Sequence, residues 1–289
     1  MFTAECDSMV SNLKINNSFE QLEASIKSIN NRHDSDYYIY HRKRYEHCVS
    51  RIVNLFENRN ARILDIGSHY LHVACLIQYF GLGVTGIDVP VFCSLPFVEE
   101  RARQYGINNI CVSDVSDGLF LPRYEDQFDC ILMNEIIEHI TFNPIMFWKR
   151  IYEIIKPGGF IYITTPNALS LSKIIRAAYR VFTLSGVGIN IQSIFENVTY
   201  GHHWKEYSSA ELSRYFRYLS PDFSVNIGYY SYDKPSADSG RRHHSQIKPR
   251  IARWIDMLGR RTRIFSDNLE VIIRLDERTQ WNPVPPRFA

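Results

Sequence analysis

Short apolar runs alternate with longer segments of helical periodicity along most of the chain. The runs that are too short for helices, and that end at polar or glycine-containing turns, are 63–66, 84–87, 109–113, 128–133, 160–164, 223–230 and 270–274. Long connections carrying helices separate the first of these strands, so they are expected to run parallel to one another. The pattern therefore predicts an α/β fold built on a sheet.

Helices are expected where apolar residues recur three and four positions apart. On this basis they span 38–57, the segment after Gly67 to Phe80, 96–105, 144–155, 169–182 and the segment that follows Ser208. Ser208 and Glu211 have the spacing of a capping box, which marks the start of the last of these helices. Residues 89–95 are predicted to form a loop.

The stretch from Ala61 to Asp88 predicts a nucleotide-type binding site. An apolar strand ends abruptly at Gly67, a helical segment follows, and a second strand ends at Asp88. The acid that closes the second strand of such a unit, about 20 residues past the turn glycine, accepts hydrogen bonds from ribose hydroxyls. We therefore expect this stretch to bind an adenosine-containing cofactor.

Five motifs in order resemble class I S-adenosylmethionine (SAM)-dependent methyltransferases, in particular those that act on small molecules or sugars. They are Asp65-Ile66-Gly67, Asp88, the strand 128–132, Glu135-Ile136-Ile137-Glu138-His139 and the segment 155–159. The resemblance implies a Rossmann-like sheet of seven strands with helices on both faces, a helical cover at the N-terminal end, and SAM as the cofactor.

The same resemblance implies which residues surround SAM. They are Asp65, Gly67, Ser68, His69, Asp88, Val89, Asp114, Val115 and Asn134. By analogy Asp114 accepts a hydrogen bond from the adenine amino group, although Asp-Val-Ser-Asp-Gly is equally the chemistry of a turn.

The first turn departs from the family. It reads Gly67-Ser68-His69-Tyr70-Leu71, whereas the family usually has Gly-x-Gly-x-Gly. The missing glycines normally let the backbone approach the ligand closely. Two interpretations follow: a remodelled pocket that still works, or a binding module that has lost catalysis and serves as a partner subunit.

The candidate catalytic residues are His139, His203 and Glu135. A base is needed when the acceptor is protonated at neutral pH, as a hydroxyl is, and histidine suits that role. Glu135 is predicted to act as an acid or to hold the substrate, and a helical 135–139 segment would put Glu135, Glu138 and His139 on one face.

A metal-dependent alternative rests on a second resemblance. Glu135, Glu138 and His139 with a later histidine resemble the metal site of the RNA 2′-O-methyltransferases that modify small-RNA 3′ ends, and such ligands hold a divalent ion. The same motif occurs in metal-free small-molecule enzymes, and the net charge of +2 does not favour RNA. The prediction is that no residue binds a metal.

Residues 168–200 are predicted to be an inserted substrate cap within the methyltransferase domain, 37–289. Its aromatic residues suit stacking on a sugar or ring, so the expected acceptor is a hydroxyl on a saccharide, a polysaccharide or a small metabolite. The same residues would alternatively form the cap's own core, and the apolar insertion would alternatively be a homodimer surface.

Two polar segments are predicted to be accessory, one before the domain and one inserted in it. Residues 1–36 are expected to be a loosely held N-terminal arm with one helix at 18–29. Residues 236–263 read as a basic helical insertion, either an ordinary surface helix or one that rests on an anionic surface.

The composition limits the cellular compartment and the partners that are expected. No run of the sequence reaches the ~18 apolar residues of a membrane span, and the first ten residues are acidic where a signal peptide is basic. A cytoplasmic protein is expected, without a nucleic-acid partner. The six scattered cysteines are predicted to be reduced, buried thiols.

Overall fold

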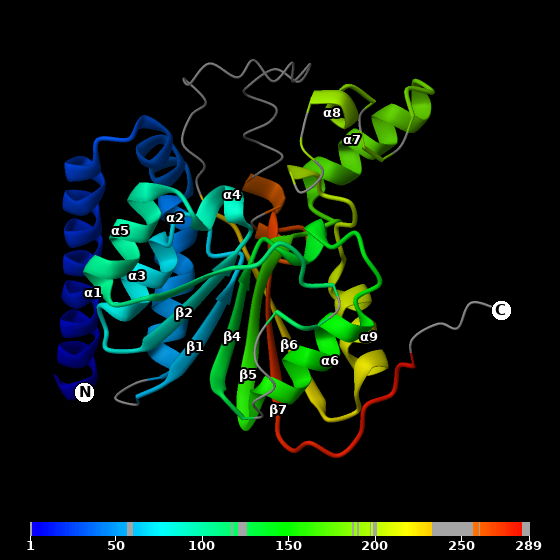
Figure 1. Ribbon diagram of the computed structural model, residues 1–289. Helices are drawn as coiled ribbons and strands as arrows, with labels where there is room; N and C mark the ends of the chain where they lie inside the picture. Colours follow the sequence, from blue (N-terminus) through cyan, green and yellow to red (C-terminus); the bar gives the residue numbers. More distant parts are fainter. Residues whose placement is uncertain are drawn as a thin grey trace. The chain divides into compact units, whose positions relative to one another are not determined.

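The computed structural model describes residues 2–56, 60–116, 118–120, 126–186, 188–189, 191–196, 198, 201–232, 257–259 and 261–284. Within these residues seven strands form one sheet in the order β3-β2-β1-β4-β5-β7-β6. The predicted seven-stranded α/β fold is therefore confirmed (Figure 1).

Every apolar run that the sequence predicted as a strand is one. The strands are β1 (Arg62–Ile66), β2 (Gly83–Asp88), β3 (Asn108–Cys111), β4 (Phe128–Asn134), β5 (Ile155–Pro166), β6 (Phe223–Tyr230) and β7 (Asn268–Leu275). β1 and β3 each pair with β2 in parallel, and β4 pairs with β5 in parallel. β7 is antiparallel to both β5 and β6.

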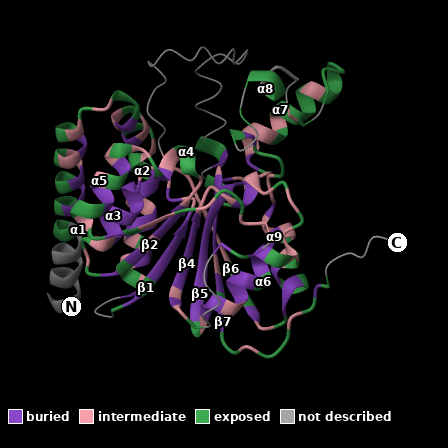
Figure 2. Ribbon diagram, in the orientation of Figure 1, coloured by how far each residue is buried: buried purple, intermediate pink, exposed green. Residues whose placement is uncertain are grey.

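The chain divides into two compact units, which are described separately. In the first, Met1–Asp114 with Tyr232–Ser236, the described elements are β1 to β3 with five helices. These helices are α1 (Phe2–Ile29), α2 (Arg32–Leu55), α3 (His72–Gln78), α4 (Pro90–Cys93) and α5 (Pro96–Tyr105). α1 packs along α2 and α3, and the buried positions of β1 and β2 form the centre of this unit (Figure 2).

The N-terminal segment is helical, so the prediction of a loosely held arm over residues 1–36 is wrong for its described part. α1 runs without a break to Ile29, and α2 begins before residue 36. Ile15, Phe19, Leu22 and Ile26 are buried. Their spacing of three and four residues is the stripe of a docked helix, hidden in the sequence by the polar residues around it.

A buried polar cluster fastens α2 to the rest of the first unit. The Asp34 carboxylate, in the first turn of α2, accepts hydrogen bonds from Arg101 of α5 at 3.0 Å and pairs with His72 Nε2 of α3 at 2.8 Å. All three side chains are buried. Sequence reasoning missed this cluster because its members lie 38 and 67 positions apart.

Two local predictions in this unit are corrected. The expected loop over 89–95 contains α4, since Pro90 supplies a favourable first helical residue. Cys93 at the end of α4 forms a disulfide with Cys111 of β3, contrary to the prediction of reduced thiols. Cys48, Cys75 and Cys130 are buried thiols outside any disulfide, as expected.

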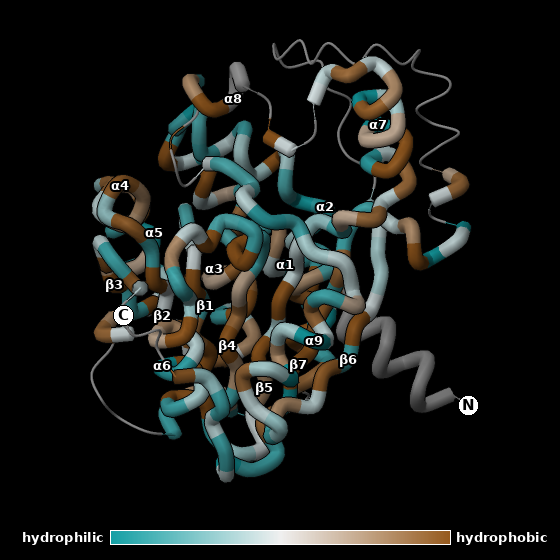
Figure 3. The backbone as a smooth tube through the Cα atoms, turned by 90° about the vertical axis from the view of Figure 1, so that its right-hand side faces the viewer, coloured by the Kyte–Doolittle hydropathy of each residue, from teal (hydrophilic) through white to brown (hydrophobic). Residues whose placement is uncertain are grey.

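The second unit, Val115–Ser231 with Ala237–Ala289, contains β4 to β7. Its described helices are η1 (Ile137–His139), α6 (Ile145–Ile154), α7 (Leu171–Phe182), α8 (Ile191–Glu196) and α9 (Ser209–Leu219). Figure 3 shows the hydrophobic tracts of β4, β5 and β7, whose apolar side chains form its core. The capping box of Ser208 and Glu211 is confirmed at α9.

The predicted basic insertion at 236–263 falls outside the described residues except for 257–259 and 261–263. Among the residues that the structure describes, no helix is long and apolar enough to cross a membrane.

Candidate functional site

The turn after β1 keeps a left-handed backbone at positions where glycine is absent. Gly67 has φ +79°, His69 has φ +48° and Leu71 has φ +62°. His69 and Leu71 occupy the second and third glycine positions of the Gly-x-Gly-x-Gly pattern. A left-handed backbone costs an L residue roughly 1–2 kcal/mol, so the surroundings, rather than the residue types, impose this conformation.

Contacts with β2 hold the turn. The amides of Gly67 and Ser68 donate to the Ile87 carbonyl at 2.8 and 3.2 Å, and the Leu71 amide donates to the Ser68 carbonyl at 2.8 Å. The Leu71 side chain is fully buried. A Cβ on Gly86 of β2 would lie only 2.8 Å from Leu71 Cδ2, so Gly86 leaves the space that Leu71 fills.

The Asp88 carboxylate lies against the turn. Its Oδ2 accepts from the His69 amide at 2.6 Å and its Oδ1 accepts from the Val89 amide at 2.7 Å. A carboxylate oxygen has two lone pairs, so each oxygen keeps one for a ribose hydroxyl. Partial burial raises the pKa of Asp88, and the two amide donors counteract that rise.

Asp65 is a buried carboxyl in the middle of this region. It lies in β1, opposite Gly86 of β2. Burial, and secondarily the charge of Asp88, raise the pKa of Asp65 to about 7. The group is therefore divided between its neutral and ionised forms near neutral pH, unlike an exposed aspartate.

Aromatic rings surround His69. Its imidazole stacks on the Tyr37 ring at 4.0 Å with an interplanar angle of 14°, and the Phe92 ring of α4 lies 4.2 Å away. Burial lowers the pKa of His69 to about 3, so this ring is neutral at pH 7. Sequence reasoning missed Tyr37 and Phe92, because neither belongs to a motif.

The structure brings six of the predicted cofactor residues together in the first unit. They are Asp65, Gly67, Ser68, His69, Asp88 and Val89. Asp114 is exposed beyond β3, and Val115 belongs to the second unit. Asn134 ends β4, where its side-chain oxygen accepts from the Thr164 hydroxyl at 3.3 Å. The roles of these last three residues stay predictions.

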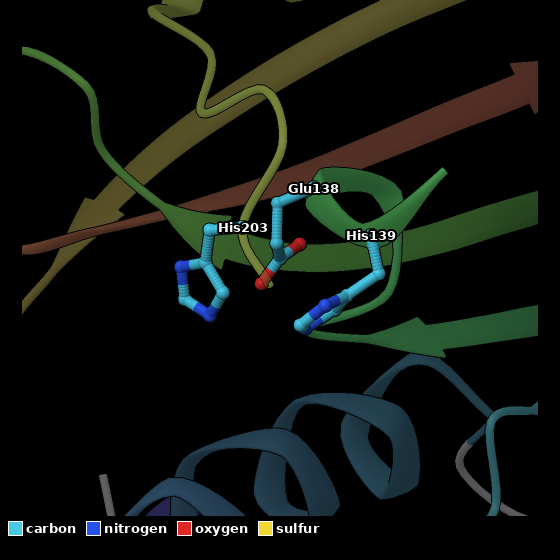
Figure 4. A group of neighbouring side chains, drawn as sticks. All are labelled: Glu138, His139 and His203. Carbon is cyan, nitrogen blue, oxygen red and sulfur yellow. The ribbon is translucent and has the colours of Figure 1, made fainter. Parts of the chain in front are cut away.

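A second cluster lies wholly within the second unit. Glu138, His139 and His203 each offer one ligand atom, and these atoms lie within 4.8 Å of one another. Figure 4 shows the Glu138 carboxylate between the two imidazole rings. Glu138 is buried, His139 is half-buried and His203 is exposed, so the cluster is open on the side of His203.

Glu135 is not part of that cluster. The structure has a 3₁₀ turn only at Ile137–His139, and Glu135 precedes it with φ +57°. The predicted common helical face of Glu135, Glu138 and His139 is therefore wrong. The Glu135 amide instead donates to the Thr164 carbonyl of β5 at 2.8 Å. Residue 135 therefore continues the pairing with β5 and is not part of a helix.

Neighbouring polar groups orient each member of the cluster. His139 Nδ1 bonds the His202 carbonyl at 2.9 Å, His203 Nδ1 bonds the Glu206 carboxylate at 3.1 Å, and the Thr165 hydroxyl donates to Glu138 at 3.0 Å. Burial, then the nearby His203, lower the pKa of His139 to about 4. Sequence reasoning missed Thr165 and Glu206; the spacing of Glu206, three residues after His203, was the available signal.

Known proteins with similar sequences are methyltransferases. The sequence profile of a family described as "Methyltransferase domain" matches residues 40–223. The chain is 35% identical over 95 residues to the mitochondrial ubiquinone biosynthesis O-methyltransferase of Dictyostelium discoideum, a match that covers 32% of this chain and 26% of that protein. It is 34% identical over 123 residues to the corresponding rat enzyme, covering 39% and 33%. The matches thus span a third or less of these relatives.

Solved structures share the fold at low sequence identity. A SAM-dependent methyltransferase from Archaeoglobus fulgidus superposes with a TM-score of 0.50 and 17% identity, covering 82% of this chain and 98% of that one. A Haloferax volcanii complex of a methyltransferase with its activator gives a TM-score of 0.52 and 18% identity, covering 82% and 92%.

Proposed function

Because the chain belongs to the methyltransferase-domain family and has the fold of the class I SAM-dependent enzymes, we propose that it transfers the methyl group of SAM to a hydroxyl oxygen. In this reaction the acceptor oxygen forms a bond to the methyl carbon, the carbon–sulfur bond breaks, and its electron pair stays on sulfur. S-adenosylhomocysteine is the second product, and the hydroxyl proton passes to solvent.

The observation that carries this proposal is the Asp88 carboxylate at the turn. The turn has lost two glycines, yet it retains the left-handed backbone and presents an acid with spare lone pairs. These features support SAM binding in a remodelled turn, which is the first of the two interpretations above. They do not favour a module that has lost its cofactor.

The proposed acceptor is a small molecule. The curated relatives are named as O-methyltransferases of ubiquinone biosynthesis, which favours a ring hydroxyl. A saccharide hydroxyl stays the second class, supported by exposed aromatic side chains on or near the insertion at Tyr179, Phe182, Phe195 and Trp204. Their exposure argues against their forming the cap's own core. Tyr200 lies outside the described residues.

The catalytic roles of His139, His203 and Glu135 remain part of the proposal. Proximity alone contributes ~7–11 kcal/mol to a displacement of this kind, so residues that hold the acceptor oxygen are the main requirement. His139 and His203 are proposed to contact that oxygen. Glu135 is half-buried at the end of β4 and is proposed to hold another polar group of the acceptor.

Calorimetry with SAM and S-adenosylhomocysteine tests the proposal. Asp88→Ala is expected to weaken SAM binding by ~1.5–3 kcal/mol, the range for hydrogen bonds to charged groups, which is ~10–150-fold in Kd. Glu99→Ala, an exposed acid in the same unit, is the matched control and should bind as the wild type does. No heat of binding to the wild type would favour the non-catalytic module.

The second measurement is methyl transfer to a panel of acceptors. Ring hydroxyls, saccharides and a short RNA form its three arms, and transfer to the RNA alone would favour the RNA enzyme over the small-molecule one. The proposed location is the cytoplasm, although both relatives are named as mitochondrial. Imaging of the tagged protein distinguishes the two compartments.

A further inference from the structure

The segment that carries His203 is fastened directly to the turn that carries Glu138 and His139. The Trp204 amide donates to the Glu138 carbonyl at 2.8 Å, and the Lys205 amide donates to the same oxygen at 3.3 Å. His203, which is more than 60 positions from Glu138 and His139 in sequence, is thus carried by a segment that backbone hydrogen bonds hold against their turn. The backbones of the two segments, and not only their side chains, therefore hold the cluster together.

The hydrogen bonds of the two imidazoles determine which nitrogen is available. A carbonyl or carboxylate oxygen accepts, so Nδ1 of His139, facing the His202 carbonyl, and Nδ1 of His203, facing Glu206, both carry the proton. In the neutral form of each ring, Nε2 therefore keeps a lone pair. Metal-binding histidines characteristically donate their other ring N–H to a carbonyl or carboxylate in this way.

The remaining members of the cluster have supporting contacts of the same kind. The buried Thr165 hydroxyl donates to the Glu138 carboxylate, and Lys173 pairs with Glu206 at 2.7 Å. Both carboxylates are thereby fixed in place, one beside the imidazoles and one behind them.

The separations fit a single ion. Zinc lies about 2.0–2.2 Å from its nitrogen and oxygen ligands, so ligands on opposite sides of an ion are about 4 Å apart. The three candidate atoms already lie within 4.8 Å of one another, and the His139 and His203 rings meet edge-on with centroids 4.8 Å apart. Small rotations of the exposed His203 side chain would bring the three ligand atoms to the separations that one ion requires.

From these contacts we infer that Glu138, His139 and His203 bind a divalent transition-metal ion. Two imidazoles and one carboxylate suit Mn²⁺, Fe²⁺, Co²⁺ or Zn²⁺ better than Mg²⁺ or Ca²⁺, which prefer oxygen ligands throughout. Glu135 is not a ligand, which distinguishes this set from the four-residue alternative considered from the sequence.

Three protein ligands leave at least one coordination position open, as in catalytic rather than structural sites. Resting on the proposed function, the open position is assigned to the acceptor hydroxyl, whose pKa a bound cation lowers. The hydroxyl releases its proton to water, and the resulting oxygen attacks the methyl carbon as described above. His139 and His203 then serve as ligands and do not remove the proton themselves.

Direct metal binding tests the inference without an activity assay. The full-length protein is stripped with chelator and titrated with Co²⁺, followed by its visible absorption, and with Zn²⁺, followed by calorimetry. One ion per chain is expected, with Mg²⁺ giving no comparable heat. Absence of stoichiometric Co²⁺ and Zn²⁺ binding would overturn the inference.

Variants assign the site. His203→Gln removes an exposed ligand and is expected to weaken Co²⁺ binding at least ~10–100-fold, with Glu206→Gln weakening it by a similar factor through orientation of His203. His33→Gln, an exposed histidine of the first unit, is the control and should bind as the wild type does. Wild-type affinity in His203→Gln, with its melting temperature unchanged, would place the ion elsewhere and contradict the assignment.

SAM calorimetry on the same stripped and loaded samples separates this inference from the proposed function. Metal binding without SAM binding would leave the ion site standing and remove the proposed methyl transfer. SAM binding and hydroxyl methylation that persist undiminished after chelation would keep the function and remove the ion from the reaction.

Discussion

At the scale of single residues, Asp65 is a carboxyl group whose pKa the surroundings bring to neutral pH. Its pKa rises to about 7 because it is buried in β1, and because Asp88 carries a like charge nearby. Its ordinary value is 3.8. Between pH 3.8 and about pH 7 the folded protein holds a proton on Asp65 that the unfolded chain has already released. The free energy of unfolding therefore falls as the pH rises through this range.

This predicts the direction of a pH effect. The free energy of unfolding should fall relative to that of Asp65→Asn as the pH rises from 4 to 7, because the folded state binds the extra proton there. The difference is at most about 4 kcal/mol for the change in pKa to about 7, and it is constant above pH 7. Urea unfolding at several pH values measures it.

Glu99→Gln changes an exposed carboxyl of the same unit and is the control for this experiment. Its pH profile should parallel that of the wild type. An Asp65→Asn profile with the wild-type slope between pH 4 and 7 would show that the Asp65 carboxyl has an ordinary pKa.

At the scale of elements, β2 and the turn after β1 form one packing unit. Leu71 is fully buried in a left-handed conformation, and its side chain occupies the space that Gly86 leaves open. In this chain the glycine that permits the close approach lies in the strand beneath the turn. The turn can therefore carry Leu71 where the family has glycine, and the burial of that side chain compensates for the backbone strain.

Gly86→Ala is expected to be destabilising for this reason. A Cβ at Gly86 would meet Leu71 Cδ2 at 2.8 Å and Ser68 Oγ at 2.9 Å, and overpacking of this kind costs typically 1–3 kcal/mol. Because the turn would move away from β2, SAM affinity should fall as well. Thermal unfolding and SAM calorimetry are the measurements.

Gly83→Ala is the matched control in the same strand, since its Cβ would meet nothing closer than the Ala61 carbonyl at 3.7 Å. Adding Leu71→Ala to Gly86→Ala should recover part of the loss, so that the two changes are not additive. Strict additivity would mean that Leu71 and Gly86 do not compete for the same space.

At the scale of the whole molecule, the described residues of the insertion between β5 and β6 are loosely packed. None of the residues of α7 is buried, and Phe182 and Phe195 are exposed to 88% and 84%. Basic residues Lys173, Arg176 and Arg180 accompany these apolar side chains without an acid in the helix. Figure 3 shows hydrophobic and hydrophilic positions interspersed along α7. A surface of this kind suits the acceptor or a second copy of the chain.

The double change Phe182→Ser and Phe195→Ser is expected to leave the free energy of unfolding within ~0.5 kcal/mol of wild type, as exposed substitutions do. If the insertion is the proposed cap, KM for the acceptor rises while the Kd for SAM is unchanged. Steady-state kinetics and SAM calorimetry check this. Dissociation of a dimer in sedimentation, with KM unchanged, would assign the surface to self-association.

Most elements of this chain were predictable, because local patterns specify them. The strand ending at Asp88, the helix Pro96–Tyr105 and the capping box at Ser208 follow from apolar periodicity and from the chemistry of helix ends. Only residues 18–29 of α1 were predicted to be helical, because its apolar stripe lies among polar residues. The disulfide escaped it because the approach of Cys93 to Cys111 depends on how α4 packs.

In the candidate sites, too, some features follow from local sequence patterns and others only from tertiary contacts. Sequence alone determined that a turn at Gly67 and an acid at Asp88 belong to one strand–helix–strand unit, since their spacing is a property of a single segment. Only the tertiary structure decided that His69 and Leu71 keep glycine-like backbones, that Glu135 stands apart, and that His203 joins Glu138 and His139. The physical reason is that contacts between distant segments impose these arrangements, and no local pattern records them.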